Sequence, residues 1–461
     1  MPRPRSIPVA RGDRLTLRVE ALGDGPDGIA RVGDYVVFVP GVLPGERADV
    51  EITSAARKFG RGALLAVRDA SPDRTEPRCR HFLACGGCHR QHQDYDTQLA
   101  DKRTRLQRAL DHSLGEDAPT VADVLAGAPY GQRHKVVLHL RGGGERPLET
   151  CFHRLRSPEL VAVQECPASE PGAWALARAA ARLLERLGHT AWDPDFAQQG
   201  LLRSLLVRRT TLGEAHLVLV ARRPHVPGLD TIVEDLHRAG ATTIAVNGNA
   251  GEFSQLLGPE TRLVSGPPRI RERLGDIDYL LSPDAFFQTA PRTAMRIVQL
   301  VVDWLSPSRS DDVGDLYCGG GLLTLPLARR ARSAFGIERS RRAIDDADAA
   351  ARHNRIQNVT WRTGPVERWL EDCRQGRLPR PQLVALDPPR TGLSPDVVQE
   401  LAALRPRRLA YVSCEPQARA RAPGARRAVG FTTRGVEPVD MFPQTCHVES
   451  VALLEMRAGR A

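Results

Sequence analysis

A cysteine stands where an apolar run ends near the carboxyl end of the chain, in Leu409-Ala-Tyr-Val-Ser-Cys-Glu-Pro416. In an open α/β sheet, ligands and chemistry collect at the carboxyl ends of the strands, so the thiol of Cys414 is placed to act as a nucleophile. A lone cysteine after a strand is more often a buried structural residue. The other motifs of the chain therefore have to decide between these two interpretations.

Three more cysteines lie close together in Cys79-Arg-His-Phe-Leu-Ala-Cys85-Gly-Gly-Cys88. Glycines let the backbone fold inward there, and thiolates at this spacing indicate a site for a soft metal or a cluster. A fourth ligand is needed; Cys166 before a proline is the best candidate, and Cys151 is the alternative. If the metal is zinc, a histidine could complete the site, and the candidates are His81, His89 and His92.

A glycine turn follows an apolar run in Asp315-Leu-Tyr-Cys-Gly-Gly-Gly321. Glycines let the backbone approach a ligand closely, and a following helix offers its N-terminus. Glu338 ends the next apolar run about 20 residues later, where an acidic side chain accepts hydrogen bonds from ribose hydroxyls. No Gly-Lys-Ser/Thr sequence accompanies the turn, which argues against a nucleoside triphosphate site.

Three further polar residues stand at the ends of apolar runs or beside them. Asp387 precedes two prolines that lock its loop, although it could also cap the next turn. Gln288, in Ser282-Pro-Asp-Ala-Phe-Phe-Gln-Thr289, could clamp a ligand. Glu449 is a carboxylate at the start of the last apolar run.

Regular alternation of apolar runs and helical stretches surrounds these motifs from about residue 291 onward. This pattern is typical of a parallel, doubly wound sheet. The apolar runs lie at 311–317, 333–337, 383–386 and 408–412, and helical stretches lie at 339–354 and 394–404.

The first part of the chain has a different pattern, with short strands and glycine turns between residues 13 and 69. Such a pattern predicts a small barrel, which either binds a partner or only packs on its neighbour. A polar, basic helix is expected at 95–114, and residues 118–281 mix strands and helices as in an α+β domain. Two basic spots in that domain, 133–135 and 203–209, could touch phosphate groups of a ligand.

Composition limits the class of protein. A chain of 461 residues is long enough for several domains. It has no apolar run of membrane-spanning length and no signal-peptide core, so a soluble, cytoplasmic protein without a membrane partner is expected. The net charge of +10 favours a polyanionic partner, and nine cysteines in a cytosolic chain favour metal ligation or catalysis over disulfides.

The motifs together resemble a known family. The N-terminal barrel, with Gly28-Ile-Ala-Arg31, resembles the RNA-binding, OB-like TRAM domain. Phe-Phe-Gln, the glycine turn, Asp-Pro-Pro-Arg, Ser-Cys-x-Pro and His-Val-Glu occur in the order found in the RNA uracil-5-methyltransferases. The cysteine spacing is similar to the iron–sulfur motif of that family, and its domain content looks closest to the enzymes that act on 23S rRNA.

The resemblance implies a multidomain α/β architecture. A TRAM-like barrel is expected at 1–70 and a central α+β domain with cluster cysteines at 71–285. A Rossmann-like, S-adenosylmethionine-dependent methyltransferase domain is expected at 286–461. The protein is expected to act as a monomer on RNA, with rRNA favoured and tRNA as the alternative.

The resemblance also implies roles for the residues. Uracil C5 is a weak nucleophile, and a thiolate from Cys414 would activate it by adding to C6. Glu449 matches the family's base for the C5 proton. By the same resemblance, the residues that hold S-adenosylmethionine are Gln288, Tyr317, Glu338 and Asp387, and those that hold a [4Fe–4S] cluster are Cys79, Cys85, Cys88 and Cys166. The alternative for Asp387 is a contact with the uracil, instead of or in addition to the cofactor.

Two other classes of protein remain as alternatives. A catalytically weak, RNA-binding relative would explain the barrel and the charge, and an iron–sulfur redox or radical enzyme would explain the cysteines. The chain departs from the family pattern at Glu415, Leu322 and Pro423-Gly424, and the negative charge of Glu415 is expected to raise the pKa of the neighbouring thiol.

Overall fold

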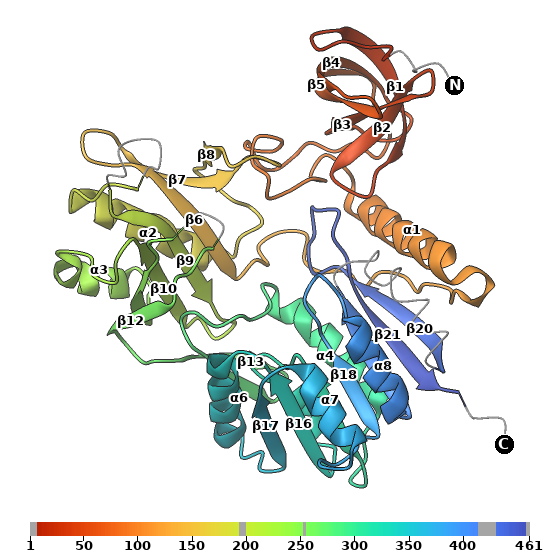
Figure 1. The fold of residues 1–461 in the computed structure, drawn as a ribbon. Coiled ribbons are helices and arrows are strands. Elements are labelled where there is room, and N and C mark those ends of the chain that lie inside the picture. The colour runs from red at the N-terminus through yellow and green to blue at the C-terminus, as the bar shows by residue number, and fades with distance from the viewer. Residues whose placement is uncertain (1–6, 193–199, 252–254, 414–429, 458–461) are drawn as a thin grey trace. The chain divides into compact units, whose positions relative to one another are not determined.

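The computed structural model describes residues 7–192, 200–251, 255–413 and 430–457 of the chain (Figure 1). The chain divides into two compact units. The first contains Met1–Arg105, Phe152–Val161 and Phe442–Cys446, and the second contains Leu106–Cys151, Ala162–Met441 and His447–Ala461. In the described part of the chain, no helix has the length and apolar character needed to cross a membrane.

The N-terminal strands close into a barrel, drawn in red in Figure 1. Alternating apolar side chains such as Val37 and Val39 fill its interior. The strands approach closely at Gly62, where a Cβ atom would lie 2.1 Å from Cγ1 of Val50. The predicted small barrel is confirmed, with strand order β1-β2-β3-β5-β4 and bounds β1 Arg14–Leu22, β2 Asp27–Val32, β3 Tyr35–Pro40, β4 Arg47–Ala55 and β5 Phe59–Asp69.

The cysteine loop follows β5, and helix α1 (Tyr95–Leu114) follows the loop, as the polar pattern predicted. The next part of the chain forms a seven-stranded sheet that carries helices α2 (Pro171–Arg186) and α3 (Val233–Arg238). Its strand order is β12-β11-β10-β9-β6-β7-β8. The bounds are β6 Lys135–Gly142, β7 Leu148–His153, β8 Leu160–Ala162, β9 Leu202–Arg209, β10 Ala215–Ala221, β11 Thr243–Gly248 and β12 Glu260–Ser265.

The C-terminal part of the chain begins after the hairpin of β13 (Ile270–Leu274) and β14 (Ile277–Leu281). Its sheet has the order β17-β16-β15-β18-β19-β21-β20, with five parallel strands and β21 antiparallel to β19. The helices are α4 Pro291–Leu305, α5 Thr324–Ala328, α6 Arg341–His353, α7 Val366–Arg374 and α8 Pro395–Leu404. The strands are β15 Asp312–Leu316, β16 Ser333–Glu338, β17 Val359–Thr363, β18 Leu383–Leu386, β19 Arg408–Ser413, β20 Phe431–Val439 and β21 Glu449–Met456.

This order confirms the predicted doubly wound sheet and adds two strands, β17 and β20, that the apolar runs did not indicate. The chain passes from β15 outward to β16 and β17, and then returns to the other side of β15 as β18. Such a reversal opens a crevice at the carboxyl ends of the central strands. The predicted cofactor residues Tyr317, Glu338 and Asp387 all lie at those ends.

Candidate active site

The carboxyl ends of β15, β16 and β18 meet at the glycine turn. The amide of Cys318 donates to the carbonyl of Ile337 over 3.0 Å, and the amide of Asp387 donates to the carbonyl of Leu316 over 3.4 Å. These bonds continue the strand ladders beyond the last paired residues. The sheet therefore brings the predicted residues Tyr317, Glu338 and Asp387 to one edge.

The glycine turn itself is open on one side. Gly319 and Gly321 have positive φ angles of 52° and 83°, and Tyr317 adopts the same left-handed region with φ 65°. A Cβ atom at Gly321 would lie 3.1 Å from the Trp361 ring, whereas one at Gly319 or Gly320 would meet no atom within 4 Å. A ligand can therefore reach the turn at Gly319 and Gly320. The helix after the turn, α5, has only five residues, so its dipole is small. Hydrogen bonds from the backbone amides of the turn are therefore the main interaction that this turn offers to a ligand.

Glu338 is held in place by the turn. Its Oε2 accepts a hydrogen bond from the amide of Gly319 over 3.3 Å, and its Oε1 accepts one from the amide of Ser340 over 2.9 Å. The side chain is half-buried at the end of β16. A carboxylate oxygen has further lone pairs, so Glu338 can also accept from ligand hydroxyls.

Asp315 is a buried carboxyl group beneath the turn that the sequence analysis did not select. Its Oδ2 accepts a hydrogen bond from Oγ1 of Thr324 over 2.5 Å, and its Oδ1 is buried with no hydrogen-bond partner within the described residues. Burial, together with the negative charges of Asp387 and Glu338, raises the pKa of Asp315 to about 7. Its place at the start of the turn motif was the only sequence signal for Asp315, because its burial depends on the neighbouring strands β16 and β18 and on Thr324 of α5.

Asp387 follows β18 at the rim of the crevice and remains partly exposed. Desolvation of the carboxyl group raises the pKa of Asp387 to about 6. At neutral pH most of the Asp387 carboxyl group is therefore still ionised, and its oxygens can accept hydrogen bonds from a polar ligand.

The segment 282–289, which carries Gln288, is anchored at several points. The Ser282 hydroxyl donates to Oδ1 of Asp346 in α6 over 2.6 Å, and Arg342 of the same helix pairs with Asp284. Further along, the carbonyl of Thr289 accepts from the amide of His134 over 2.8 Å. Phe286 nevertheless stays 73% exposed on this fixed backbone. The half-buried Gln288 is thus carried by a segment tied to helix α6 and to the residue that precedes β6.

Glu449 begins β21, next to the point where β19 ends. Ser413, the last residue of β19, is directly opposite Ser450, whose hydroxyl donates to the Ser413 carbonyl over 3.5 Å. Glu449 is only 6% exposed and is opposite Val439 of β20. Cys414 comes immediately after Ser413 and lies outside the described residues, as do Glu415 and Pro423-Gly424. The ladder therefore fixes Glu449 beside the strand that leads into the predicted nucleophile.

Both ends of the chain match known protein families. Residues 8–65 match the TRAM domain, and residues 268–457 match the tRNA (Uracil-5-)-methyltransferase family. An uncharacterized RNA methyltransferase of Halalkalibacterium halodurans is 32% identical, over 98% of this chain and 99% of its own length. One from Nostoc sp. is 32% identical over 96% of each chain.

The chain belongs to the RNA uracil-5-methyltransferase family. A solved structure agrees with this assignment across nearly the whole length. The tRNA (uracil-54, C5)-methyltransferase of Pyrococcus abyssi, in complex with S-adenosyl-L-homocysteine, is 25% identical, with a TM-score of 0.77. The similarity covers 95% of this chain and 99% of the archaeal one. The predicted TRAM barrel, the methyltransferase domain and the enzyme class are thereby confirmed.

The cysteines of this methyltransferase divide between the two units. Cys79, Cys85 and Cys88 are half-buried in the first unit, where Sγ of Cys85 accepts a hydrogen bond from the amide of Gly87 over 3.3 Å. Cys166 is half-buried in the second unit. Cys151 is fully buried in β7, and burial raises the pKa of its thiol to about 11. Burial therefore disfavours the thiolate form of Cys151, which is the form that binds metals.

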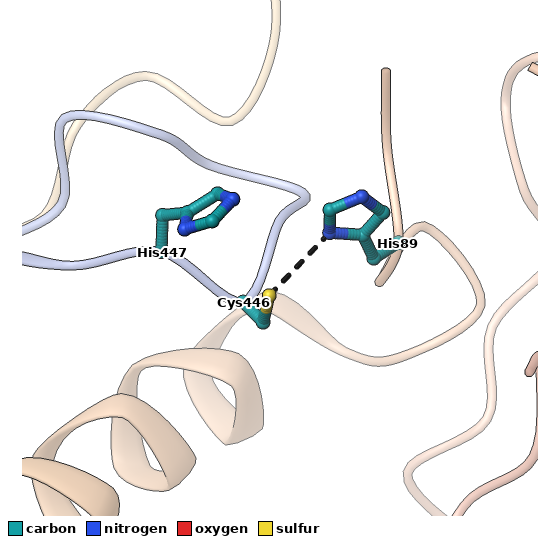
Figure 2. A group of neighbouring side chains, drawn as sticks. All are labelled: His89, Cys446 and His447. Carbon is teal, nitrogen blue, oxygen red and sulfur yellow. Dashed lines mark hydrogen bonds between the residues drawn. The ribbon is translucent and has the colours of Figure 1, made fainter. Parts of the chain in front are cut away.

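The histidines near the cysteine loop have other contacts. His92 is buried, and burial lowers its pKa to about 4 while its Nε2 donates to the carbonyl of Val42. Nδ1 of His89 lies 3.5 Å from Sγ of Cys446 (Figure 2). Cys446 was not among the ligands predicted from the sequence. Figure 2 also draws His447, the next residue in the chain. This pairing of His89 depends on segments more than 350 positions apart, so no local motif could have indicated it.

Proposed function

We propose that this methyltransferase adds a methyl group to C5 of a uridine in RNA through a covalent bond between Cys414 and uracil C6. The ladder between β19 and β21 carries the proposal, because it places Glu449 beside the strand that enters Cys414. A nucleophile and a base on adjacent strands suit a reaction in which an adduct forms and a proton is then removed.

The residues at the edge of the sheet fit S-adenosylmethionine as the methyl donor. Open space at Gly319 and Gly320 admits a ligand, and Glu338 offers lone pairs to ribose hydroxyls at the end of β16. Gln288, Tyr317 and Asp387 would hold the rest of the molecule. When bound, this cosubstrate supplies an electrophilic methyl group on sulfur.

The protein side chains supply the remaining chemistry. The Cys414 thiolate attacks C6 of the uracil, and the electron pair of the C5–C6 double bond moves to make C5 nucleophilic. After C5 has taken the methyl group, Glu449 removes its proton, the double bond forms again and the C6–S bond breaks. Because the target base has to leave its stack to reach these groups, a loop or single strand of RNA is the substrate.

We propose 23S rRNA as the substrate, because a TRAM barrel accompanies the cysteine motif. A tRNA is the second candidate, since the similar archaeal enzyme is named for uracil-54 of tRNA. Nucleoside mass spectrometry of separated rRNA and tRNA from a strain without this gene will test both. We expect 5-methyluridine to disappear from rRNA alone and to return with the wild-type gene. Loss from tRNA alone would select the second substrate, and no loss from either pool would contradict the proposed reaction.

We also propose a [4Fe–4S] cluster on Cys79, Cys85, Cys88 and Cys166. The donor set supports it, because half-buried thiols of this number and spacing suit an iron–sulfur cluster. Anaerobically purified enzyme is expected to contain about four iron atoms per chain. The Cys166→Ser variant should lose this iron, whereas Cys151→Ser, the matched control, should keep it. Stoichiometric zinc in place of iron would contradict the cluster, and iron loss in the control instead would make Cys151 the ligand.

A further inference from the structure

A row of polar side chains crosses four strands of the central sheet. Lys135 in β6 is directly opposite Arg208 in β9, which is opposite His216 in β10, which is opposite Thr243 in β11. Directly opposed residues have side chains on the same face of a sheet. The row thus unites the two basic spots at 133–135 and 203–209, which are about 70 positions apart in the sequence.

Three members of the row hold the segment that leads to Gln288. Oγ1 of Thr243 donates to the Pro267 carbonyl over 2.7 Å, Nε2 of His216 to the Leu281 carbonyl over 2.7 Å, and Nη2 of Arg208 to the Ala285 carbonyl over 2.9 Å. Arg208 is only 3% exposed. These three side chains fix the backbone up to the residue before the exposed Phe286.

Lys135, the fourth member, has no such partner. In the part of the chain that the structure describes, its ammonium group makes no hydrogen bond and no ion pair, although the side chain is half-buried. Burial, and then the positive charge of Arg208, lower the pKa of Lys135 to about 8. Glu272, the carboxylate whose charge acts on Arg208, accepts hydrogen bonds at Oε1 from the amide and hydroxyl of Thr211 and from the amide of Arg273, and it forms no ion pair with Lys135 within the described residues. A half-buried cation without a counterion costs stability, which favours an anion as its missing partner.

The position of Lys135 connects this anion to the reaction. The preceding residue, His134, donates its amide to the carbonyl of Thr289, which follows Gln288. The same segment exposes the ring of Phe286, and an aromatic ring on a fixed backbone is a surface on which an RNA base can stack. An RNA strand that reaches the active site can therefore place a backbone phosphate at this lysine.

We propose that Lys135 binds a phosphate of the substrate RNA close to the target uridine, with Arg208 and His216 as positioning residues. This inference rests on the proposed function, because it takes RNA as the substrate. It adds a contact between the RNA and the central sheet to the contacts proposed at the carboxyl ends of the C-terminal sheet. A phosphate contact of this kind contributes affinity and a dependence on salt, and does not read the base.

Filter binding of full-length Lys135→Met to the rRNA and tRNA pools of the deletion strain will test the proposal. For the pool that the wild-type enzyme methylates, we expect the variant to bind about tenfold more weakly than the wild type does. The negative slope of log affinity against log salt should become shallower by about 0.7, the value for one phosphate contact to a single strand. Lys135→Arg should keep the slope. Arg238→Met removes the same charge where Asp235 pairs with it, and should leave both quantities unchanged.

Two further measurements distinguish a lost RNA contact from a loss of stability and from a loss of cofactor binding. The melting temperature of Lys135→Met should equal or exceed that of the wild type, because the variant removes a half-buried charge that has no counterion in the described part of the chain. Affinity for S-adenosylhomocysteine should not change. Unaltered RNA affinity and slope, or a loss confined to S-adenosylhomocysteine, would overturn the proposal. Methylation by the wild type is measured in parallel, so an enzyme that binds RNA through Lys135 without methylating it contradicts only the proposed function.

Discussion

Replacing Cys414 with alanine is expected to lower the single-turnover rate of methyl transfer by more than about 10³-fold. Without the thiolate, C5 of uracil has no route to become nucleophilic, and the rest of the site cannot compensate. Transfer of a radiolabelled methyl group to RNA from the deletion strain is the measurement. Binding of S-adenosylhomocysteine and of RNA should remain, because the groups that hold them are unchanged.

A second readout distinguishes a nucleophile from a structural cysteine. RNA in which 5-fluorouridine replaces uridine has no C5 proton to remove, so the wild-type adduct should persist on a denaturing gel. Cys414→Ala should form no such band. The matched control is Cys373→Ala in α7, a buried cysteine at a distance along the chain from every motif of the site, which should still form the band. Adduct formation by Cys414→Ala would contradict the covalent mechanism.

Replacing Glu449 with glutamine is expected to slow product release by about 10²–10⁴-fold, the usual contribution of a general base. The amide has the shape of the carboxylate but cannot take the C5 proton. The first steps do not need that proton transfer, so a methylated enzyme–RNA adduct should accumulate. A denaturing gel that carries the radiolabelled methyl group will detect this species.

The control for this variant lies on the same strand. Glu455 in β21 forms ion pairs with Arg408 and Arg434 near the opposite end of the strand. Glu455→Gln should release product at the wild-type rate, apart from a small change in stability. Wild-type turnover by Glu449→Gln would exclude this carboxylate as the base and leave another group, or solvent, in that role.

Much of the fold could be predicted from local pattern. Strands of the barrel and the core strands β15, β16, β18 and β19 are apolar or alternating, and glycine or proline marks many of their ends, so short windows of sequence indicate them. The edge strand β17 escaped prediction because none of its five residues is fully buried, which leaves a weak apolar signal. The order of motifs along the chain was enough to indicate the family.

Several features of the site appear only when distant segments pack together. The pairing of Ser413 with Ser450 places Glu449 beside β19, and the burial of Asp315 raises the pKa of that carboxyl group. Periodicity in a sequence shows which face of a strand is buried, but it does not show which strand lies beside it.

The row from Lys135 to Thr243 makes the same distinction clear. Both basic spots were visible in the sequence, yet their meeting depends on the register between β6 and β9, and a shift of one residue would turn Lys135 to the other face of the sheet. The register is set by the packing of apolar side chains such as Val137 and Leu206 against other parts of the chain. Local residue order therefore determines the chemical groups that this methyltransferase possesses, whereas long-range hydrophobic packing determines which of those groups meet.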